Sequence, residues 1–305
     1  MAASAGDALY AEASANVEPA PAKINLALHV TGRRGDGYHT LDTLVVFADE
    51  GDLIRAEEIS GGAVKTEAVG PFGEALTEAL KTGDNLVLKA AQAIGARRFG
   101  RDGLRLIINK RLPLASGMGG GSADAAATLR LLHRLNGGGN ERGLSGHAAR
   151  LGADVPMCLI SQPLRAQGIG ERIDRVTGIP ALPLVLVNPG ERLATAKVFE
   201  GLRRADDQPL PMLPQRGFRS VFELVIWLRQ TKNSLEAPAR TAAKSIRRVL
   251  EALQSDPDCL FARMTGSGPT CFGIFASPAA AQRAAIRLRV GRPEWWIAPC
   301  VTGAS

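Results

Sequence analysis

The stretch PLASGMGGGSADAAATLRLL, from Pro113 to Leu132, decides the fold because it joins two different sequence patterns. The preceding LRLIINKRLP is typical of a strand, whereas SADAAATLRLLHRLN is rich in strong helix formers. Four glycines therefore lie on a strand-to-helix turn. Backbone N–H groups freed of side chains form a concave anion site, and the helix N-terminus adds about half a positive charge. A plain tight turn would explain one or two glycines, so the stretch predicts a phosphate-binding loop.

The two common phosphate-binding motifs do not match this loop. A Walker A loop needs a Gly-Lys dipeptide, and none occurs in the chain. A dinucleotide fingerprint needs a third glycine where Ser122 stands, and the catalytic motifs of protein kinases are absent. Neither of the common motifs therefore accounts for the loop.

Length and composition fit an ordinary soluble globular protein, with either two domains or one large α/β domain, and are compatible with an enzyme. The 305 residues carry a net charge of +7, dispersed in pairs of arginines, which suits an anionic metabolite better than nucleic acid. Four widely spaced cysteines indicate neither a zinc site nor a disulfide framework. The sequence contains no signal peptide and no apolar run of the ~20 residues that a membrane span needs. We therefore expect a cytoplasmic protein with no nucleic-acid or membrane partner.

The alternation of strand and helix patterns predicts an α+β fold, with a second domain beginning near residue 165. AKINLALHV, residues 22–30, alternates as a strand with Lys23, Asn25 and His29 on one face. TLDTLVVFADEGDLIRAEE is expected to form two strands separated by ADEGD. A helix capped by Asp84 should follow, and GADVPMCLI should contain a turn and a strand.

Five stretches together resemble one enzyme superfamily. LPLASGMGGGSADAAA resembles the phosphate-binding motif of the galactokinase, homoserine kinase, mevalonate kinase and phosphomevalonate kinase (GHMP) superfamily. PAKINLALHVTGRRGDGYHTLDTLVVFAD, MTGSGPTCFGIF, GADVPMCL and KNSLEAPA are similar to it as well, in unbroken order from about Glu18 to the C-terminus. Within the superfamily, the first of these four looks like the kinases that act on 4-diphosphocytidyl-2-C-methyl-D-erythritol.

The resemblance implies a fold and an activity. Residues 1–18 are rich in alanine and are expected to form a flexible extension. The resemblance implies an ATP-binding and catalytic domain like the second domain of ribosomal protein S5 over 19–165, and a ferredoxin-like substrate domain over 166–305. The terminal strand is expected either to remain in the C-terminal domain or to return to the N-terminal domain. The implied activity is ATP-dependent phosphorylation of the 2-hydroxyl of 4-diphosphocytidyl-2-C-methyl-D-erythritol, in non-mevalonate isoprenoid synthesis, by a monomer or weak homodimer. A sibling kinase for homoserine or mevalonate is the alternative, and a non-catalytic RNA-binding protein is a more distant one.

The resemblance also assigns the catalytic pair. It implies that Asp154 of GADVP takes the proton of the acceptor hydroxyl, and that Lys23 of PAKIN keeps that carboxylate ionised and steers the acceptor oxygen. Taken alone, Asp154 would be read as a turn or cap residue before Pro156, and Lys23 as a solvated charge on a strand.

The remaining site residues divide between nucleotide, substrate and metal. The resemblance places ATP on Pro113, Leu114, Ala115, Ser116, Gly117, Met118, Gly119, Gly120, Gly121, Ser122 and Ala123. It places the substrate on Asn25, Tyr38, His39, Thr195, Phe199, Gly266, Ser267 and Gly268, with Tyr38 and His39 holding the cytidine. Mg²⁺ should accompany ATP, with Ser122 as the candidate ligand and no acidic ligand evident. His29, His133 and His147 are expected to be structural.

Overall fold

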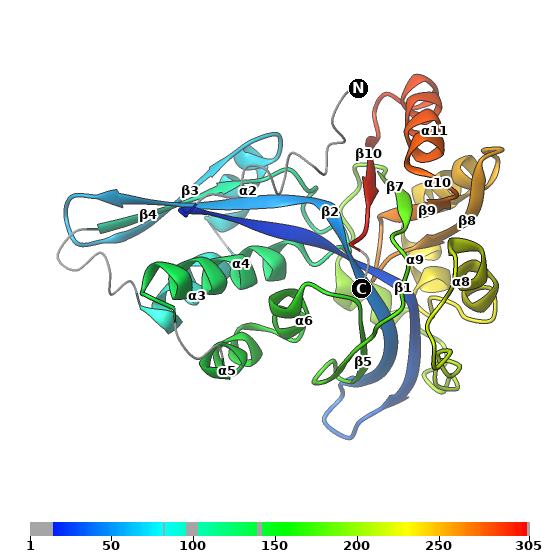
Figure 1. The fold of residues 1–305 in the computed structure, drawn as a ribbon, viewed down its shortest axis with the longest axis horizontal. Helices are drawn as coiled ribbons and strands as arrows, with labels where there is room; N and C mark the ends of the chain where they lie inside the picture. Colours follow the sequence, from blue (N-terminus) through cyan, green and yellow to red (C-terminus); the bar gives the residue numbers. More distant parts are fainter. Residues whose placement is uncertain (1–14, 82, 96–102, 139–141, 304–305) are drawn as a thin grey trace.

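The described residues of the computed structural model, 15–81, 83–95, 103–138 and 142–303, form two sheets, each covered by helices (Figure 1). The larger sheet has six strands in the order β3-β4-β2-β5-β6, with β1 on the other edge of β2. Its strands are β1 (Val17–Arg33), β2 (His39–Ile59), β3 (Val64–Val69), β4 (Gly103–Asn109), β5 (Leu164–Gly168) and β6 (Arg172–Arg175). Its helices are α2 (Gly73–Leu80), α3 (Leu86–Ile94), α4 (Gly120–Leu135), α5 (Arg142–Leu151) and α6 (Val155–Ile160). This sheet continues to Arg175, beyond the expected domain limit at 165.

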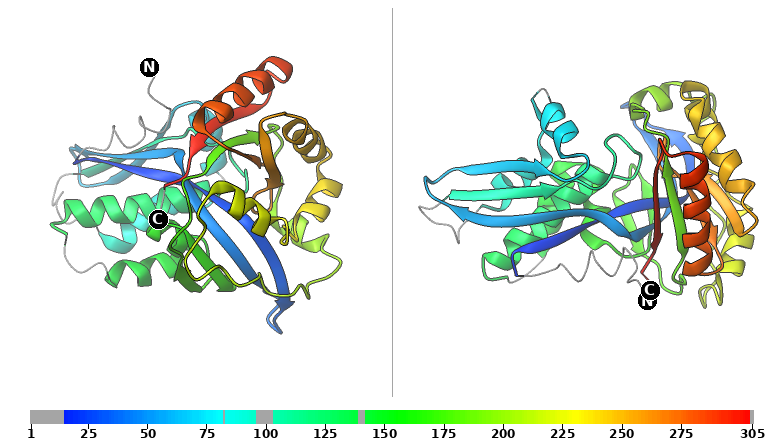
Figure 2. Two further views of the ribbon diagram at one scale, coloured as in Figure 1. Left: turned by 45° about the vertical axis from the view of Figure 1, so that its right-hand side comes forward. Right: turned by 90° about the horizontal axis from the view of Figure 1, so that it is seen from above.

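The smaller sheet has four antiparallel strands in the order β10-β7-β9-β8. They are β7 (Pro183–Asn188), β8 (Cys259–Met264), β9 (Cys271–Phe275) and β10 (Trp296–Val301). The helices of this half are α7 (Thr195–Glu200), α8 (Val221–Leu228), α9 (Glu236–Ala242), α10 (Ser245–Gln254) and α11 (Pro278–Gly291), and α11 lies along the outside of β7 and β10 (Figure 2). The terminal strand β10 thus pairs within this sheet, and Thr302 beyond it bridges to Ala48 of β2.

The expected break within ADEGD is wrong, because β2 runs without interruption for 21 residues. Its partner β1 continues alongside, pairing Pro21 with Gly51 and Ala20 with Asp52. A Cβ atom at Gly51 would lie 2.4 Å from the carbonyl oxygen of Ala20. The glycine therefore permits close approach of two strands and does not form a turn, so pairing with a distant segment overrides the local signal.

Two smaller expectations also fail. The segment after Asp154 is the short helix α6 and not a strand, with Pro156 in the first turn, where a missing N–H costs little. The cap of α3 is Asn85 and not Asp84, since the Asn85 side chain accepts a hydrogen bond from the N–H of Leu88 at 2.9 Å. The end of the helix expected there, residues 96–99, lies outside the described part of the chain.

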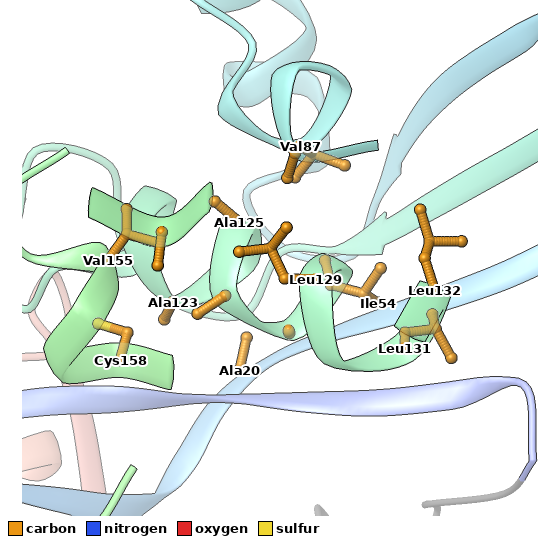
Figure 3. Close-up of a cluster of buried hydrophobic side chains, with 14 of the residues drawn as sticks. Ala20, Ile54, Val87, Ala123, Ala125, Leu129, Leu131, Leu132, Val155 and Cys158 are labelled. Carbon is orange, nitrogen blue, oxygen red and sulfur yellow. The ribbon is translucent and has the colours of Figure 1, made fainter. Parts of the chain in front are cut away.

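Helix α4 follows the glycine-rich loop and is anchored in the core of the larger half (Figure 3). Its buried side chains, Ala123, Ala125, Leu129 and Leu132 among them, share one cluster with Ala20 of β1, Ile54 of β2, Val87 of α3 and Val155 of α6. A buried and well-packed helix holds its N-terminus in a fixed position. No helix within the described ranges is long and apolar enough to cross a bilayer.

Strand β1 takes part in the core of both halves. Ala20 packs in the cluster around α4, Ile24 packs where the two sheets meet, and Val30 packs beneath the smaller sheet. Strand β1, which carries Lys23 and Asn25, is therefore packed into the cores of both halves.

Candidate active site

The glycine-rich loop leads directly into the N-terminus of α4. The helix begins at Gly120, and its cap residue Gly119 has a left-handed φ of 65° and no side-chain capping bond. The first N–H groups of the helix are consequently open toward a ligand. The backbone carbonyl of Met118 accepts a hydrogen bond from the N–H of Lys23 at 3.0 Å, which ties the loop to β1. The loop is thus tied to β1, and its helix N-terminus has the chemistry that suits an anion.

This loop lines a cavity of about 730 Å³ between the two halves. Most of the residues expected from the sequence to bind ligands reach it, from both halves of the chain. They are Lys23, Asn25, Tyr38, Pro113, Leu114, Ala115, Ser116, Gly117, Gly119, Gly120, Gly121, Ser122, Asp154, Thr195, Phe199, Gly266 and Ser267. Met118 and Ala123 do not line it, because their side chains are buried in the core. Gly268 does not line it either, and His39 lines a neighbouring cavity.

Lys23 and Asp154 meet in this cavity. The Lys23 Nζ lies 2.6 Å from Asp154 Oδ1, with the lysine side chain buried and the aspartate side chain 40% exposed. Asp154 occupies the cap position of α6, yet its carboxylate makes no capping hydrogen bond. The carboxylate is therefore fixed by the ammonium and accessible from the cavity, which an acid–base group requires.

A β-bulge determines which side chains of β1 face the cavity. The register with β2 shifts between Asn25 and Ala27, so Lys23, Asn25 and Leu28 line the cavity. The expectation that His29 shares the face of Lys23 and Asn25 is therefore wrong. The His29 Nε2 accepts the N–H of Lys232 at 3.1 Å, so its Nδ1 carries the proton and donates to the Gln208 carbonyl at 2.7 Å. This histidine is structural, as expected.

The second glycine turn, Thr265 to Thr270, packs directly against the phosphate loop. A Cβ atom at Gly266 would lie 2.3 Å from the carbonyl oxygen of Gly117, and one at Gly117 would lie 2.7 Å from the nitrogen of Gly268. Both Gly117 and Gly266 also have positive φ angles. Beside this contact, the hydroxyls of Thr195 and Ser267 are hydrogen-bonded at 2.8 Å. Loops from the two halves thus form a single wall.

A second cavity, of about 710 Å³, adjoins the first through shared wall residues. Tyr38 and Phe199 line both cavities, and the His39 ring stacks on Phe199 with 5.0 Å between ring centroids. Burial and the nearby Arg33 lower the pKa of His39, so its ring is neutral at pH 7. Tyr38 is 63% exposed, which leaves an aromatic face open to a flat ligand.

Sequence reasoning missed a second lysine beside the loop. The Lys110 Nζ lies 2.6 Å from Asp52 Oδ2 and 2.7 Å from Asp124 Oδ2, and all three side chains are almost fully buried. Asp52 Oδ1 also accepts the backbone N–H groups of Arg111 and Leu112. Lys110 and Asp124 line the cavity. The only local signal was the position of Lys110 at the end of a strand that leads into the loop.

Other wall residues were missed because no local pattern marks them. Leu76 of α2 and Leu86 of α3 add apolar surface at the glycine-loop side of the molecule, and Thr43 of β2 adds a hydroxyl. Each lies on an element that reads as ordinary structure in the sequence.

The oxygen atoms in the cavity suit a magnesium ion bound mainly by phosphate. Ser122, Asp124 and Asp154 each line the cavity with an oxygen donor, which is the donor type that Mg²⁺ prefers. Among the described residues, no group of three or more His, Cys, Asp or Glu is arranged to hold a metal alone. This donor set fits an ion that arrives with a nucleotide and gains one or two protein ligands.

Comparison with known proteins agrees with this geometry. Residues 85–162 match the GHMP kinases N terminal domain, and residues 223–289 match the GHMP kinases C terminal domain. The 4-diphosphocytidyl-2-C-methyl-D-erythritol kinase of Dinoroseobacter shibae is 49% identical over 92% of this chain and 93% of its own length. That of Paracoccus denitrificans is 46% identical over 92% of this chain and 94% of its own.

Solved structures give the same result. A crystal structure of 4-(cytidine 5'-diphospho)-2C-methyl-D-erythritol kinase matches with a TM-score of 0.73 and 32% identity, covering 94% of this chain and 100% of that one. The L. major mevalonate kinase, at 14% identity, shares the fold with a TM-score of 0.62 over 95% of this chain and 96% of its own. With such identity over nearly its full length, the chain belongs to the GHMP kinases and, among them, to the 4-diphosphocytidyl-2-C-methyl-D-erythritol kinase family.

Proposed function

We propose that the protein transfers the γ-phosphoryl group of ATP to the 2-hydroxyl of 4-diphosphocytidyl-2-C-methyl-D-erythritol, giving ADP and the 2-phosphate. One observation carries this proposal beyond the family assignment. A glycine loop at an open helix N-terminus and an accessible Lys23–Asp154 pair line the same cavity. The glycine loop suits a triphosphate, and the Lys23–Asp154 pair suits an alcohol.

The chemistry assigned to the pair follows from its hydrogen bond. Asp154 accepts the proton of the attacking hydroxyl, while a new bond forms between that oxygen and the γ-phosphorus and the bond from phosphorus to the β,γ-bridging oxygen breaks. Lys23, bound to Asp154 Oδ1, holds the carboxylate in one orientation and adds positive charge near the transferred group. The N–H groups at the start of α4 hold the phosphates in line.

The two adjoining cavities support an acceptor that carries a nucleotide. The methylerythritol end would occupy the first cavity, near Asn25, and the cytosine would reach the second. There Tyr38 offers an exposed ring for stacking, and neutral His39 offers one hydrogen-bond donor and one acceptor. Homoserine and mevalonate carry no flat base to use this second cavity.

Further parts of the proposal rest on family resemblance. Mg²⁺ would be held by the ATP phosphates with Ser122 and one nearby carboxylate, and it would neutralise charge across the β- and γ-oxygens. The larger half would correspond to the S5-like domain and the smaller half to the ferredoxin-like domain, with limits near residues 19, 165 and 305. We also propose a cytoplasmic location for this metabolic kinase.

An acceptor panel tests the proposal. The purified chain is incubated with Mg-ATP and, separately, with the cytidine compound, homoserine or mevalonate, and the products are identified by mass spectrometry and phosphorus NMR. We expect phosphorylation of the cytidine compound alone, at its 2-hydroxyl. Asp154→Asn should lose about a hundredfold or more in kcat. Preferential phosphorylation of another acceptor, or full activity of this variant, would overturn the proposal.

A further inference from the structure

The side chain of Asn25 is hydrogen-bonded through its amide nitrogen, but its amide oxygen has no partner among the described residues. Its backbone N–H donates to Thr265 Oγ1 at 2.9 Å, and its Nδ2 donates to Thr43 Oγ1 at 2.8 Å. Its Oδ1 is buried and has no hydrogen-bond partner among the described residues. Asn25 and Thr43 both line the main cavity. A buried carbonyl oxygen without a partner is rare and costly, so this atom indicates a missing ligand group.

Thr43 determines which end of the amide is open. Its hydroxyl donates its single proton to the carbonyl oxygen of Ala27 at 2.7 Å. Toward Asn25 it can therefore only accept, and it accepts from Nδ2. The opposite orientation of the amide would bring two acceptor oxygens together. Oδ1 consequently faces away from Thr43, on the side of Gly266, where a Cβ atom would lie 3.5 Å from it.

We propose that Thr43 is a positioning residue that orients the Asn25 carboxamide so that Oδ1 receives the proton of a second hydroxyl on the acceptor substrate. This proposal rests on the proposed function. Lys23 and Asn25 lie two residues apart on one face of β1, in regular register with β2. Their Cα atoms are therefore separated by about 6–7 Å. Asn25 therefore recognises a hydroxyl close to the one that faces Asp154. The substrate class is an alcohol with a neighbouring hydroxyl, and an acceptor with only one hydroxyl would leave Oδ1 unpaired.

Steady-state kinetics of Thr43→Val, with acceptor and ATP varied separately, test this role. Valine keeps the shape of the side chain but can neither accept from Asn25 nor donate to Ala27. We expect the KM for the cytidine acceptor to rise about tenfold while the KM for ATP stays unchanged. Thr43→Ser should restore the acceptor KM, because it retains the hydroxyl. Thr302→Val is the matched control, since it removes a buried hydroxyl that binds the Leu182 N–H and does not line the cavity.

A double-mutant cycle tests whether Thr43 acts through Asn25. If it does, Thr43→Val should cause no further rise in acceptor KM when Asn25 is already alanine. An equal rise in both backgrounds, an equal rise in the KM for ATP, or no rise at all would overturn the positioning role while leaving the proposed function standing. Failure of the unaltered protein to phosphorylate the acceptor would instead overturn both proposals.

Discussion

Two lysine–aspartate sites flank the same glycine loop and differ in their access to solvent. A Cβ atom at Gly119 would lie 3.3 Å from Lys23 Cε, and one at Gly120 would lie 3.1 Å from Lys110 Nζ. Successive glycines thus face different ammonium groups. Both lysines lie 2.6 Å from an aspartate oxygen, but Asp154 is 40% exposed whereas Asp52 is fully buried.

The difference separates a carboxylate that a substrate can reach, Asp154, from one that it cannot reach, Asp52. A partly exposed carboxylate can exchange its proton with a substrate, and solvent screens its charge when its partner is removed. Carboxylates buried together depend on their cation, because an unpaired charge in the interior is costly. Similar ion-pair geometry therefore predicts opposite consequences of mutation at the two sites.

The largest effect is expected for Lys110→Met. The substitution leaves the Asp52 and Asp124 carboxylates buried without a cation, so the free energy of unfolding should fall by about 3–5 kcal/mol. Urea denaturation measures this loss. Lys81→Met is the control, because its pair with Glu78 is exposed and should contribute no more than about 1 kcal/mol. Equal losses of unfolding free energy in the two variants would contradict the distinction between buried and exposed ion pairs.

Lys23→Met should instead reduce activity strongly and stability only moderately. We expect kcat to fall about a hundredfold, equivalent to about 2.7 kcal/mol, because Asp154 loses its partner near the reacting groups. The loss of unfolding free energy should be smaller than that of Lys110→Met, because Asp154 can be solvated. Kinetic assays and urea denaturation of the same preparation test both statements. A variant with normal kcat and a large loss of stability would show that Lys23 is structural.

Alanine substitutions in the first turn of α4 sharpen the comparison at the level of packing. Gly120→Ala and Gly121→Ala gain the same helix propensity, but only the first crowds an ammonium group. The nearest atom to a Cβ at Gly121 is Leu86 Cδ1, at 3.9 Å. Gly120→Ala should therefore be less stable than Gly121→Ala by about 1–3 kcal/mol in thermal unfolding. Identical stabilities would mean that Lys110 is free to move aside.

The smallest expected effect is a change in pH dependence. Burial, with the charge of Asp52 adding to it, raises the pKa of Asp124 from its ordinary 3.8 to about 7, although Lys110 opposes the shift. The folded state thus holds this proton more tightly than the unfolded state. Its contribution to stability is full below the ordinary pKa and is lost as the pH rises through about 7.

Asp124→Asn should therefore flatten the fall in unfolding free energy between about pH 4.5 and about pH 7.5. Glu50, whose pKa burial also raises to about 7, should leave part of the slope in place. Urea denaturation of both proteins at the two pH values gives the difference. An unchanged slope would show that Asp124 is ionised in the folded protein throughout this range.

The sequence was most informative where structure is local. The glycine loop and the helix after it follow from glycine content and helix propensity over a short stretch, and the structure confirms the strand-to-helix turn. The ADEGD segment carries an equally clear turn signal, but pairing of β1 with β2 overrides it. Distant pairing is invisible in a local pattern.

The same limit of local patterns separates the site residues that were predicted from those that were missed. Resemblance to a family singled out Lys23 and Asp154, and the structure brings them together across 131 positions of sequence. Lys110 and Thr43 were missed, because a lysine at a strand end and a threonine within a strand are ordinary residues. The bulge after Asn25 shifts the facing of β1 by one residue and could not be foreseen from alternation.

Strand β1 has a mechanical consequence, because one continuous strand contributes buried residues to the cores of both halves. Hinge rotation of one half against the other would have to bend this strand and separate Gly117 from Gly266, which already touch. We therefore expect ligands to bind in the cavity without a large rotation of one half against the other. For the same reason, heat or denaturant should melt both halves in a single cooperative transition.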